Sequence, residues 1–225
     1  MHSYSIDSKA RRECVIIIFV ISMAVSLILC RLLFGSTTFI SIVKHFRDND
    51  VVRLMEWWGA VPSLLTVSAI YGLLACIFDN VLWKYAPFRL MHKIPDLNGT
   101  WEGILESSFN GEKIPMKLTI KQTWTSISLK SEYCETSSYS YSNVAAICIK
   151  GNRGIALYFG YTNNSKKIGN CPQIHDGYNI LVLENKDSLN GKYFNDRKNP
   201  NSAIKGGNLG TITLTRKHRT NAKNM

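Results

Sequence analysis

The sequence predicts an N-terminal membrane hairpin of two transmembrane helices, followed by a small all-β domain. Two apolar stretches without a charged residue, from Cys14 to Cys30 and from Trp57 to Phe78, lie in the first part of the chain. From Asn98 onward, apolar residues recur at every second position, which is the spacing of a half-buried strand. No segment after Asn98 has a helical pattern, so the second part is expected to be all β.

Both apolar stretches are long enough to span a bilayer. Crossing the hydrocarbon core takes roughly 20 apolar residues, with about 17 as the lower end. The second stretch exceeds this length, and the first extends to Phe34 if Arg31 reaches to the interface. We therefore expect spans at about 14–34 and 57–78 within a hairpin formed by residues 1–85.

The orientation of the hairpin follows from its flanking charges and from the cysteines. Two spans place both chain ends on one side of the membrane, and basic residues flank both outer ends of the hairpin. The intervening loop is also basic, so the charge bias alone is weak. The six cysteines have no C-x-x-C motif and no disulfide spacing, which is typical of a reducing compartment. We expect an uncleaved multi-pass anchor with both termini and the β-domain in the cytoplasm.

The remaining chain divides into a linker, a barrel and a tail. Residues 86–97 form a short linker that holds the β-domain close to the bilayer. Residues 98–216 contain about eight short strands separated by turn signals such as Gly151–Gly154. Eight short strands fit a small closed antiparallel barrel of lipocalin-like type, because closure leaves no exposed edge; a β-sandwich is the alternative. Residues 217–225 form a basic tail.

The charge of the chain indicates an anionic partner. The net charge is +11, and the segment 96–225 has 17 Lys and Arg against 10 Asp and Glu. This balance favours a nucleotide, a nucleic acid or a lipid headgroup as the partner. A solvated surface beside an anionic membrane is the alternative. The motifs H-E-x-x-H, G-x-S-x-G, G-x-G-x-x-G and the P-loop are absent, so we expect no enzymatic activity, no cofactor and no metal.

Polar and aromatic residues on otherwise apolar strand faces form the candidate ligand site. A barrel of about eight strands has room for one small ligand. Aromatic rings stack on bases, and an arginine such as Arg197 binds a phosphate bidentately. The candidate binding residues are Arg197, Tyr193, Trp124, Gln122, Tyr133, Trp101, Asn143 and Arg153. The alternative is that the rings fill the core and that Gln122 and Asn143 hydrogen-bond each other.

The order of segments and three short motifs resemble one protein family. The motifs are LNGTWEG at Leu97–Gly103, which opens the barrel, and GKYF at Gly191–Phe194 with GTI at Gly210–Ile212, which close it. Together with two transmembrane segments and a proline-flanked linker, they resemble the two-transmembrane β-barrel effectors of the bacterial cyclic-oligonucleotide-based antiphage signalling systems (CBASS). The likeness covers nearly the whole chain.

The resemblance implies a function. In this family, a cytoplasmic eight-stranded barrel binds a cyclic dinucleotide, not a nucleic-acid polymer, which a partner nucleotidyltransferase makes on infection. Binding then drives assembly of a homo-oligomer in the inner membrane, disruption of the bilayer and cell death before phage release. Two other functions stay open: a membrane-anchored, lipocalin-like binder of an apolar ligand, and a non-enzymatic docking subunit of an envelope complex.

Overall fold

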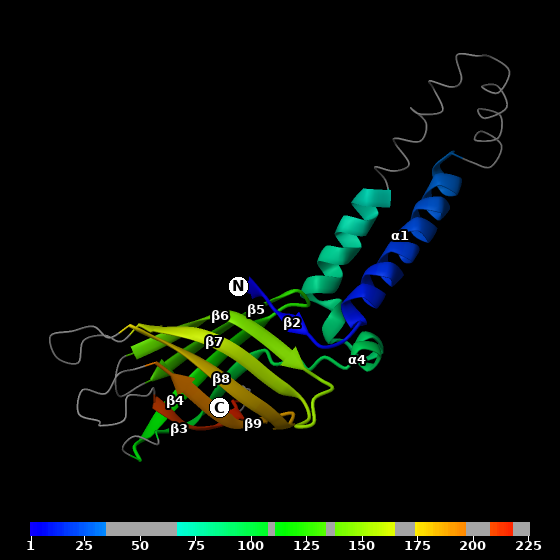
Figure 1. The fold of residues 1–225 in the computed structure, drawn as a ribbon. Coiled ribbons are helices and arrows are strands. Elements are labelled where there is room, and N and C mark those ends of the chain that lie inside the picture. The colour runs from blue at the N-terminus through cyan, green and yellow to red at the C-terminus, as the bar shows by residue number, and fades with distance from the viewer. Residues whose placement is uncertain (35–66, 108–110, 134–137, 165–173, 197–207, 218–225) are drawn as a thin grey trace, which may run out of the picture. The chain divides into compact units, whose positions relative to one another are not determined.

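The chain forms two compact units. The computed structural model describes residues 1–34, 67–107, 111–133, 138–164, 174–196 and 208–217. One unit is Lys9–His92, and the other combines Met1–Ser8 with Lys93–Met225. Helices make up the first unit, and a strongly curved sheet makes up the second (Figure 1).

The helical unit begins with one long apolar helix, α1 (Ala10–Phe34). Within the described residues, its segment Ala10–Leu29 is the one helix that is long and apolar enough to cross a membrane. A shorter apolar helix covers Val67–Asn80. It is followed by the 3₁₀ turn η1 (Leu82–Lys84) and the helix α4 (Ala86–His92). The structure thus supplies one candidate membrane anchor, in the position of the first predicted span.

Aromatic contacts connect the helices of this unit. The ring of Phe19 on α1 meets that of Tyr71 edge to face, with 6.4 Å between their centroids. Phe78 and Phe88 meet in the same way at 5.3 Å. Such T-shaped pairs add to the stability gained from burial alone. The second predicted span, 57–78, lies partly outside the described residues, and its described end is helical.

The predicted linker begins as a helix. Pro87 lies in the first turn of α4, where its missing N–H costs no helical hydrogen bond. His92 ends the helix, and its Nε2 is 2.8 Å from the carbonyl oxygen of Trp83. Burial of the imidazole lowers the pKa of His92, so the neutral ring is favoured at this site.

Eight antiparallel strands form a closed barrel in the second unit. Each strand pairs with the next along the chain and the last strand pairs with the first, so the ring is closed, although β5 and β6 pair over only part of their length. The predicted small closed antiparallel barrel is confirmed. The strands are β3 (Gly99–Ser107), β4 (Lys113–Gln122), β5 (Ser126–Tyr133), β6 (Ser138–Cys148), β7 (Ala156–Asn164), β8 (His175–Asn185), β9 (Ser188–Asn195) and β10 (Asn208–Arg216).

The up-and-down order gives the barrel two distinct ends. We call the end at which β3 begins the linker end, because residues 93–98 lead into β3 there. Two short strands near the N-terminus, β1 (His2–Ser3) and β2 (Ser5–Ile6), also join the barrel at this end, against β5 and β6. We call the opposite end, at which β3 finishes, the distal end.

The inner face of the first strands follows the predicted alternation. Met116, Leu118 and Ile120 point inward from β4 and are only 3%, 0% and 2% exposed. Trp101 and Leu105 do the same on β3. Period-two spacing therefore identifies the buried face wherever the strand is regular.

Strand β6 departs from the prediction. Its register with β7 shifts between Ser142 and Val144. Tyr141, before the shift, is 47% exposed, whereas Ala145, after it, is buried. Strict alternation would place Tyr141 and Asn143 on the inner face with Ala145, as the prediction of Asn143 as a binding residue requires. That prediction is wrong, because a β-bulge adds one residue and reverses the side of the sheet to which the following residues point.

Candidate ligand-binding site in the barrel

The lining of the barrel changes from apolar to polar along its length. Near the middle, a row of residues paired across β7, β8 and β10 is aliphatic: Leu157, Leu181 and Ile212, with Gly191 between the last two. The next positions toward the distal end are polar or aromatic. These residues are Ser107, Ser131, Tyr133, Ser140, Phe159, Tyr161, Asn163, Asn179 and Tyr193, and all but Tyr133 are at most 5% exposed. We call this set the distal lining.

Glycines make room for two of the tyrosine rings. A Cβ atom at Gly177 would lie 2.4 Å from the hydroxyl oxygen of Tyr161, which occupies that space. A Cβ atom at Gly210 would likewise lie 2.6 Å from Cε1 of Tyr193. Side chains essentially never approach this closely, so each ring requires a glycine on the neighbouring strand. The sequence thus places tyrosines and glycines together to build the distal lining.

The tyrosine hydroxyls are held in their neutral form. Burial raises the pKa of Tyr133, while the nearby hydroxyls of Ser140 and Ser131 act in the opposite direction. Burial also raises the pKa of Tyr161, which hydrogen-bonds to the side chain of Asn195. Neutral phenols both donate and accept hydrogen bonds, so these groups can bind the polar edge of a ligand at any physiological pH.

Oδ1 of Asn163 is a buried polar atom of the distal lining that has no partner among the described residues. Asn163 is 5% exposed, yet within the described part of the chain its Oδ1 accepts no hydrogen bond. Asn163 faces Ser140 across the β6–β7 pair. Leaving a buried acceptor unsatisfied costs about 1–3 kcal/mol, so a native structure seldom retains one without a reason. A ligand with an N–H or O–H group would satisfy it.

The distal lining can therefore bind aromatic, polar and neutral groups. Tyrosine and phenylalanine rings provide surfaces for stacking, and asparagine and serine provide hydrogen bonds for base edges or ribose hydroxyls. It contains no lysine or arginine among the residues that the structure describes. A phosphate group would need basic residues from elsewhere in the chain.

Two of the predicted site residues belong to the distal lining. Tyr133 and Tyr193 come from β5 and β9, and each lies close enough to influence the ionisation of the other. Tyr161, which was not predicted to bind ligand, lies near both. These three hydroxyls form the polar centre of the distal lining.

Three other predicted residues lie at the linker end. Gln122 accepts a hydrogen bond from the backbone N–H of Leu97 at 2.9 Å and donates one to the hydroxyl of Tyr4 at 3.2 Å. Trp124 is buried in the turn between β4 and β5. Trp101 donates from Nε1 to the carbonyl of Leu97 at 3.0 Å. Gln122 and Trp101 therefore attach the linker to the barrel, away from the distal lining.

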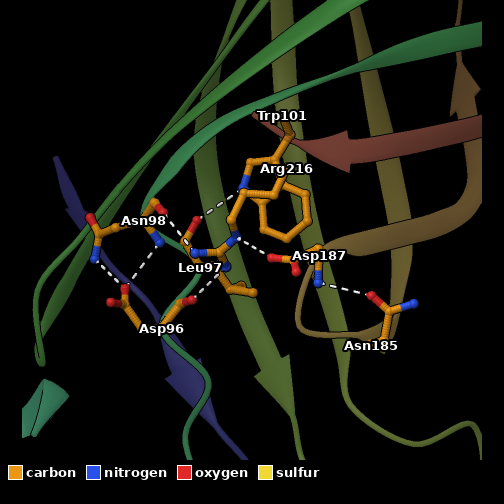
Figure 2. A network of polar contacts seen from close by, with 7 residues as sticks. All are labelled: Asp96, Leu97, Asn98, Trp101, Asn185, Asp187 and Arg216. Atoms are coloured by element: carbon orange, nitrogen blue, oxygen red, sulfur yellow. Dashed lines mark hydrogen bonds and ion pairs between the residues drawn. The ribbon is translucent and has the colours of Figure 1, made fainter. Parts of the chain in front are cut away.

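Arg216 completes the attachment of the linker, as Figure 2 shows. Its guanidinium lies 4.4 Å from the centre of the Trp101 ring and donates to the carbonyl oxygens of Asp96 and Asn98, at 2.7 and 3.2 Å. Its Nε is 3.7 Å from a carboxylate oxygen of Asp187. Stacking, hydrogen bonds and charge together fix the last linker residues against β3 and β10.

The remaining predicted residues are not in the distal lining. Asn143 is exposed on the outer surface, where its Nδ2 donates to Thr162. Arg153 is exposed in the turn between β6 and β7, at the linker end. Arg197 lies outside the described residues, and its predicted role as the phosphate ligand stays a prediction.

Sequence reasoning missed Tyr161, Asn163 and Asn179. Neither a tyrosine in an apolar run nor an asparagine near the end of a strand is by itself a signal of a binding site. Alternation shows which residues point inward, but it does not show at which end of the barrel they meet. The order of the strands, taken with their direction, would have grouped these residues with Tyr133 and Tyr193.

The fold and the distal lining define a small β-barrel receptor for a ligand with polar, stackable groups. Comparison with known proteins specifies its kind. Residues 92–216 match the family model of Cap15, cyclic dinucleotide receptor domain. The chain is 34% identical over 149 residues to a CD-NTase-associated protein 15 of Escherichia albertii, covering 64% of this chain and 70% of that protein. It is 26% identical over 141 residues to a CD-NTase-associated protein 15 of Staphylococcus schleiferi, covering 61% and 73%.

The chain belongs to the Cap15 family of cyclic dinucleotide receptors. The resemblance to CBASS effectors drawn from the sequence is confirmed, as is a cyclic dinucleotide as the class of ligand. A receptor domain implies a binding role, and the candidate membrane helix α1 provides an anchor.

Proposed function

We propose that this protein is an antiphage effector whose cytoplasmic barrel binds a cyclic dinucleotide in the distal lining. Binding promotes homo-oligomerisation in the bacterial inner membrane and disrupts the bilayer, which kills the infected cell. The ligand comes from a partner nucleotidyltransferase, and the chain itself catalyses no reaction. The proposal keeps the predicted division into a membrane hairpin at 1–85, a linker at 86–97, a barrel at 98–216 and a tail at 217–225.

The change of lining along the barrel carries this proposal. A cyclic dinucleotide brings two bases, with faces that stack on tyrosine rings and edges that hydrogen-bond to amides. Tyr133, Tyr161 and Tyr193 supply the rings, and the unpartnered Oδ1 of Asn163 supplies an acceptor for an exocyclic amine or a ring N–H. The two phosphates would bind Arg197, which follows β9 in the sequence.

The membrane step rests on the helices and on the position of the barrel in the chain. The helix α1 and the second apolar stretch form a multi-pass anchor with both termini in the cytoplasm. A ligand shifts an equilibrium only as far as it prefers one state over the other, so the cyclic dinucleotide must bind the assembled form more tightly than the monomer. Clustered hairpins then thin or perforate the bilayer.

The two other candidate functions fit the distal lining less well. A binder of apolar ligands requires an apolar interior, whereas the distal lining buries two asparagines and three serines, among them Asn163, Asn179 and Ser140. A docking subunit requires no ligand, and no ligand would then satisfy Asn163.

The role of Arg197 is tested against a second arginine, Arg153, which lies in the turn between β6 and β7. In Arg197→Ala, cyclic dinucleotide affinity should fall by about 100-fold or more, because a charge-assisted bidentate contact is lost. Arg153→Ala removes the same charge from the linker end and should leave the affinity unchanged. Isothermal titration with the full chain in detergent micelles measures both, and circular dichroism checks that the barrel stays folded.

Two results would change the proposal. Normal affinity in Arg197→Ala would remove this residue from the site. Equal losses in both variants would show that only the overall positive charge attracts the ligand, rather than a specific contact with Arg197.

A further inference from the structure

Two neighbouring strands of the barrel, β5 and β6, pair with each other along only part of their length. We call the boundary between them the seam. Strands β5 and β6 pair only near the distal end, where Lys130–Tyr133 meets Ser138–Tyr141. Toward the linker end, the bulge in β6 separates the two strands, and the pairing between them stops. Each strand therefore has backbone groups facing a gap, which is the kind of edge that accepts an additional strand.

The N-terminus of the chain fills this gap. Strand β1 runs antiparallel to β5, with His2 opposite Ile127. Strand β2 runs parallel to β6, with Ser5 opposite Ala146. One short segment thus pairs with both sides of the seam, one side after the other. We call His2–Asp7 the clasp.

Side chains fix the clasp at its centre. Tyr4 lies between β1 and β2, is 3% exposed and belongs to the barrel core. Its hydroxyl is 3.2 Å from the carbonyl oxygen of Thr123 and accepts a hydrogen bond from Gln122 at 3.2 Å. Because Gln122 also bonds to the linker at Leu97 and Pro95, the clasp and the linker share one polar anchor.

Polar contacts hold both ends of the clasp. Nε2 of His2 is 2.8 Å from Oγ of Ser142, which in turn accepts a hydrogen bond from the backbone of β5 at Leu129. The carboxylate of Asp7 accepts hydrogen bonds from the backbone N–H groups of Ile149 and Lys150, at 2.7 and 2.9 Å. Burial acts to raise the pKa of Asp7, but these two hydrogen bonds outweigh it and lower the pKa.

The clasp connects two parts of the chain that matter for the response. On one side, α1 begins at Ala10, directly after the clasp. On the other side, the strands that hold the clasp, β5 and β6, also carry Tyr133 and Ser140 of the distal lining. The match to the receptor family begins at residue 92, so the clasp lies outside the part of the chain that this match describes.

We propose that the seam between β5 and β6 is a strand-accepting site whose occupant is the chain's own clasp, and that the clasp transmits ligand binding from the barrel to α1. The proposal rests on the proposed function, because it names the path by which that function reaches the membrane. The clasp stays bound in both states. A ligand that shifts β5 against β6 at the distal end moves the clasp at the linker end, and the clasp moves α1.

The test releases the clasp without touching the distal lining. The variant Tyr4→Ala/Asp7→Ala removes the central and terminal anchors, and Ser3→Ala/Ser5→Ala, whose side chains are exposed, is the matched control. The full-length chains are reconstituted in vesicles of phosphatidylethanolamine and phosphatidylglycerol. Three quantities are measured: hydrogen exchange at residues 2–7, affinity for a cyclic dinucleotide, and ligand-dependent release of an enclosed dye.

The release variant should separate binding from response. Hydrogen exchange of the clasp should rise by about tenfold or more as its anchors are lost, while ligand affinity stays within about threefold of the unmodified chain because the distal lining is intact. Ligand-dependent dye release should fall by about tenfold or more. The control variant should match the unmodified chain in all three measurements.

A rescue experiment shows that attachment itself is what matters. Ser5 and Ala146 are opposed in the β2–β6 pair, so Ser5→Cys/Ala146→Cys in the release variant should form a disulfide that restores dye release under oxidising conditions and loses it again on reduction. Full dye release from a variant with a freely exchanging clasp would overturn the proposal. If the unmodified chain releases no dye with any cyclic dinucleotide, the proposed function fails, and the linkage fails with it.

Discussion

Asn163 is the residue at which the receptor site can be tested most finely. Its buried Oδ1 has no partner among the described residues, and it lies beside Ser140 in the distal lining. An acceptor of this kind gains a hydrogen bond when a ligand supplies the donor. The structure thus distinguishes it from Gln122, whose amide is satisfied by the linker and by Tyr4.

Replacing Asn163 by alanine should weaken ligand binding. The loss of one buried hydrogen bond of about 1–2 kcal/mol corresponds to an affinity decrease of about 5- to 30-fold. Asn143→Ala is the matched control, because Asn143 has the same side chain on the outer surface of a neighbouring strand. Titration calorimetry of both variants measures the difference. Equal affinities in Asn163→Ala and in the unmodified chain would exclude Asn163 from the site.

The predicted site residues show what a sequence pattern can and cannot locate. The sequence predicts Tyr133 and Tyr193 as binding residues because each carries a hydroxyl group on an otherwise apolar strand face. Gln122 satisfies the same criterion, but it bonds to backbone groups of a distant segment that the pattern does not reveal. The prediction for Asn143 was wrong for a different reason. The β-bulge in β6 turns this residue outward, and no glycine or proline in the sequence marks the bulge.

At the scale of the strands, close approach of backbones explains several glycines. A Cβ atom at Gly191 would lie 1.8 Å from the carbonyl oxygen of Ile180 on the neighbouring strand. No side-chain rotation relieves such a contact, because the obstacle is backbone. Gly103 and Gly210 face similar obstacles across the β3–β10 pair. These positions allow the strands of a narrow barrel to twist and close.

The variant Gly191→Ala should therefore destabilise the barrel. Forcing a methyl group into this contact shifts one of the strands and costs about 1–3 kcal/mol. Gly151→Ala is the control, because a Cβ atom there would meet no atom closer than 3.9 Å. Urea unfolding, followed by tryptophan fluorescence, compares the two. Equal stabilities would contradict the close approach of β8 and β9 at this position.

The period-two pattern predicts the strands of the barrel and their buried residues, but it does not predict which segments meet at each end of the barrel. Alternation on β3 and β4 predicts the buried residues correctly, since these strands are regular from end to end. It does not predict that the N-terminal residues complete the seam, because segments as short as β1 and β2 carry no periodic signal. The two-residue strands exist only because β5 and β6 leave an edge for them.

At the scale of the whole molecule, α1 is the candidate membrane anchor of the receptor. Val20 lies within the apolar segment of α1 and is 57% exposed. An arginine near the centre of a membrane-spanning helix costs about 2.5–3.5 kcal/mol. Val20→Arg should therefore reduce the fraction of the chain that resists carbonate extraction from membranes by several-fold, whereas Val20→Leu should leave it unchanged. An Arg variant that is retained as firmly as the Leu variant would contradict a membrane role for α1.

The proposed receptor site lies at the distal end of the barrel, whereas the clasp, which precedes α1 in the sequence, pairs with β5 and β6 at the linker end. The two ends of the barrel also differ in charge. At the linker end, the charged side chain of Arg216 stacks on Trp101 and hydrogen-bonds to the linker, whereas the distal lining has neutral polar groups.

Ligand-dependent thermal stability tests the central claim most directly. The full chain in detergent micelles is unfolded with each member of a panel of cyclic di- and trinucleotides, and Asn163→Ala is measured in parallel. A cyclic dinucleotide at about one hundred times its dissociation constant should stabilise the barrel by about 2.7 kcal/mol, with a smaller shift in the variant. A folded chain whose melting temperature responds to no member of the panel would contradict the assignment of the distal lining as a cyclic dinucleotide site.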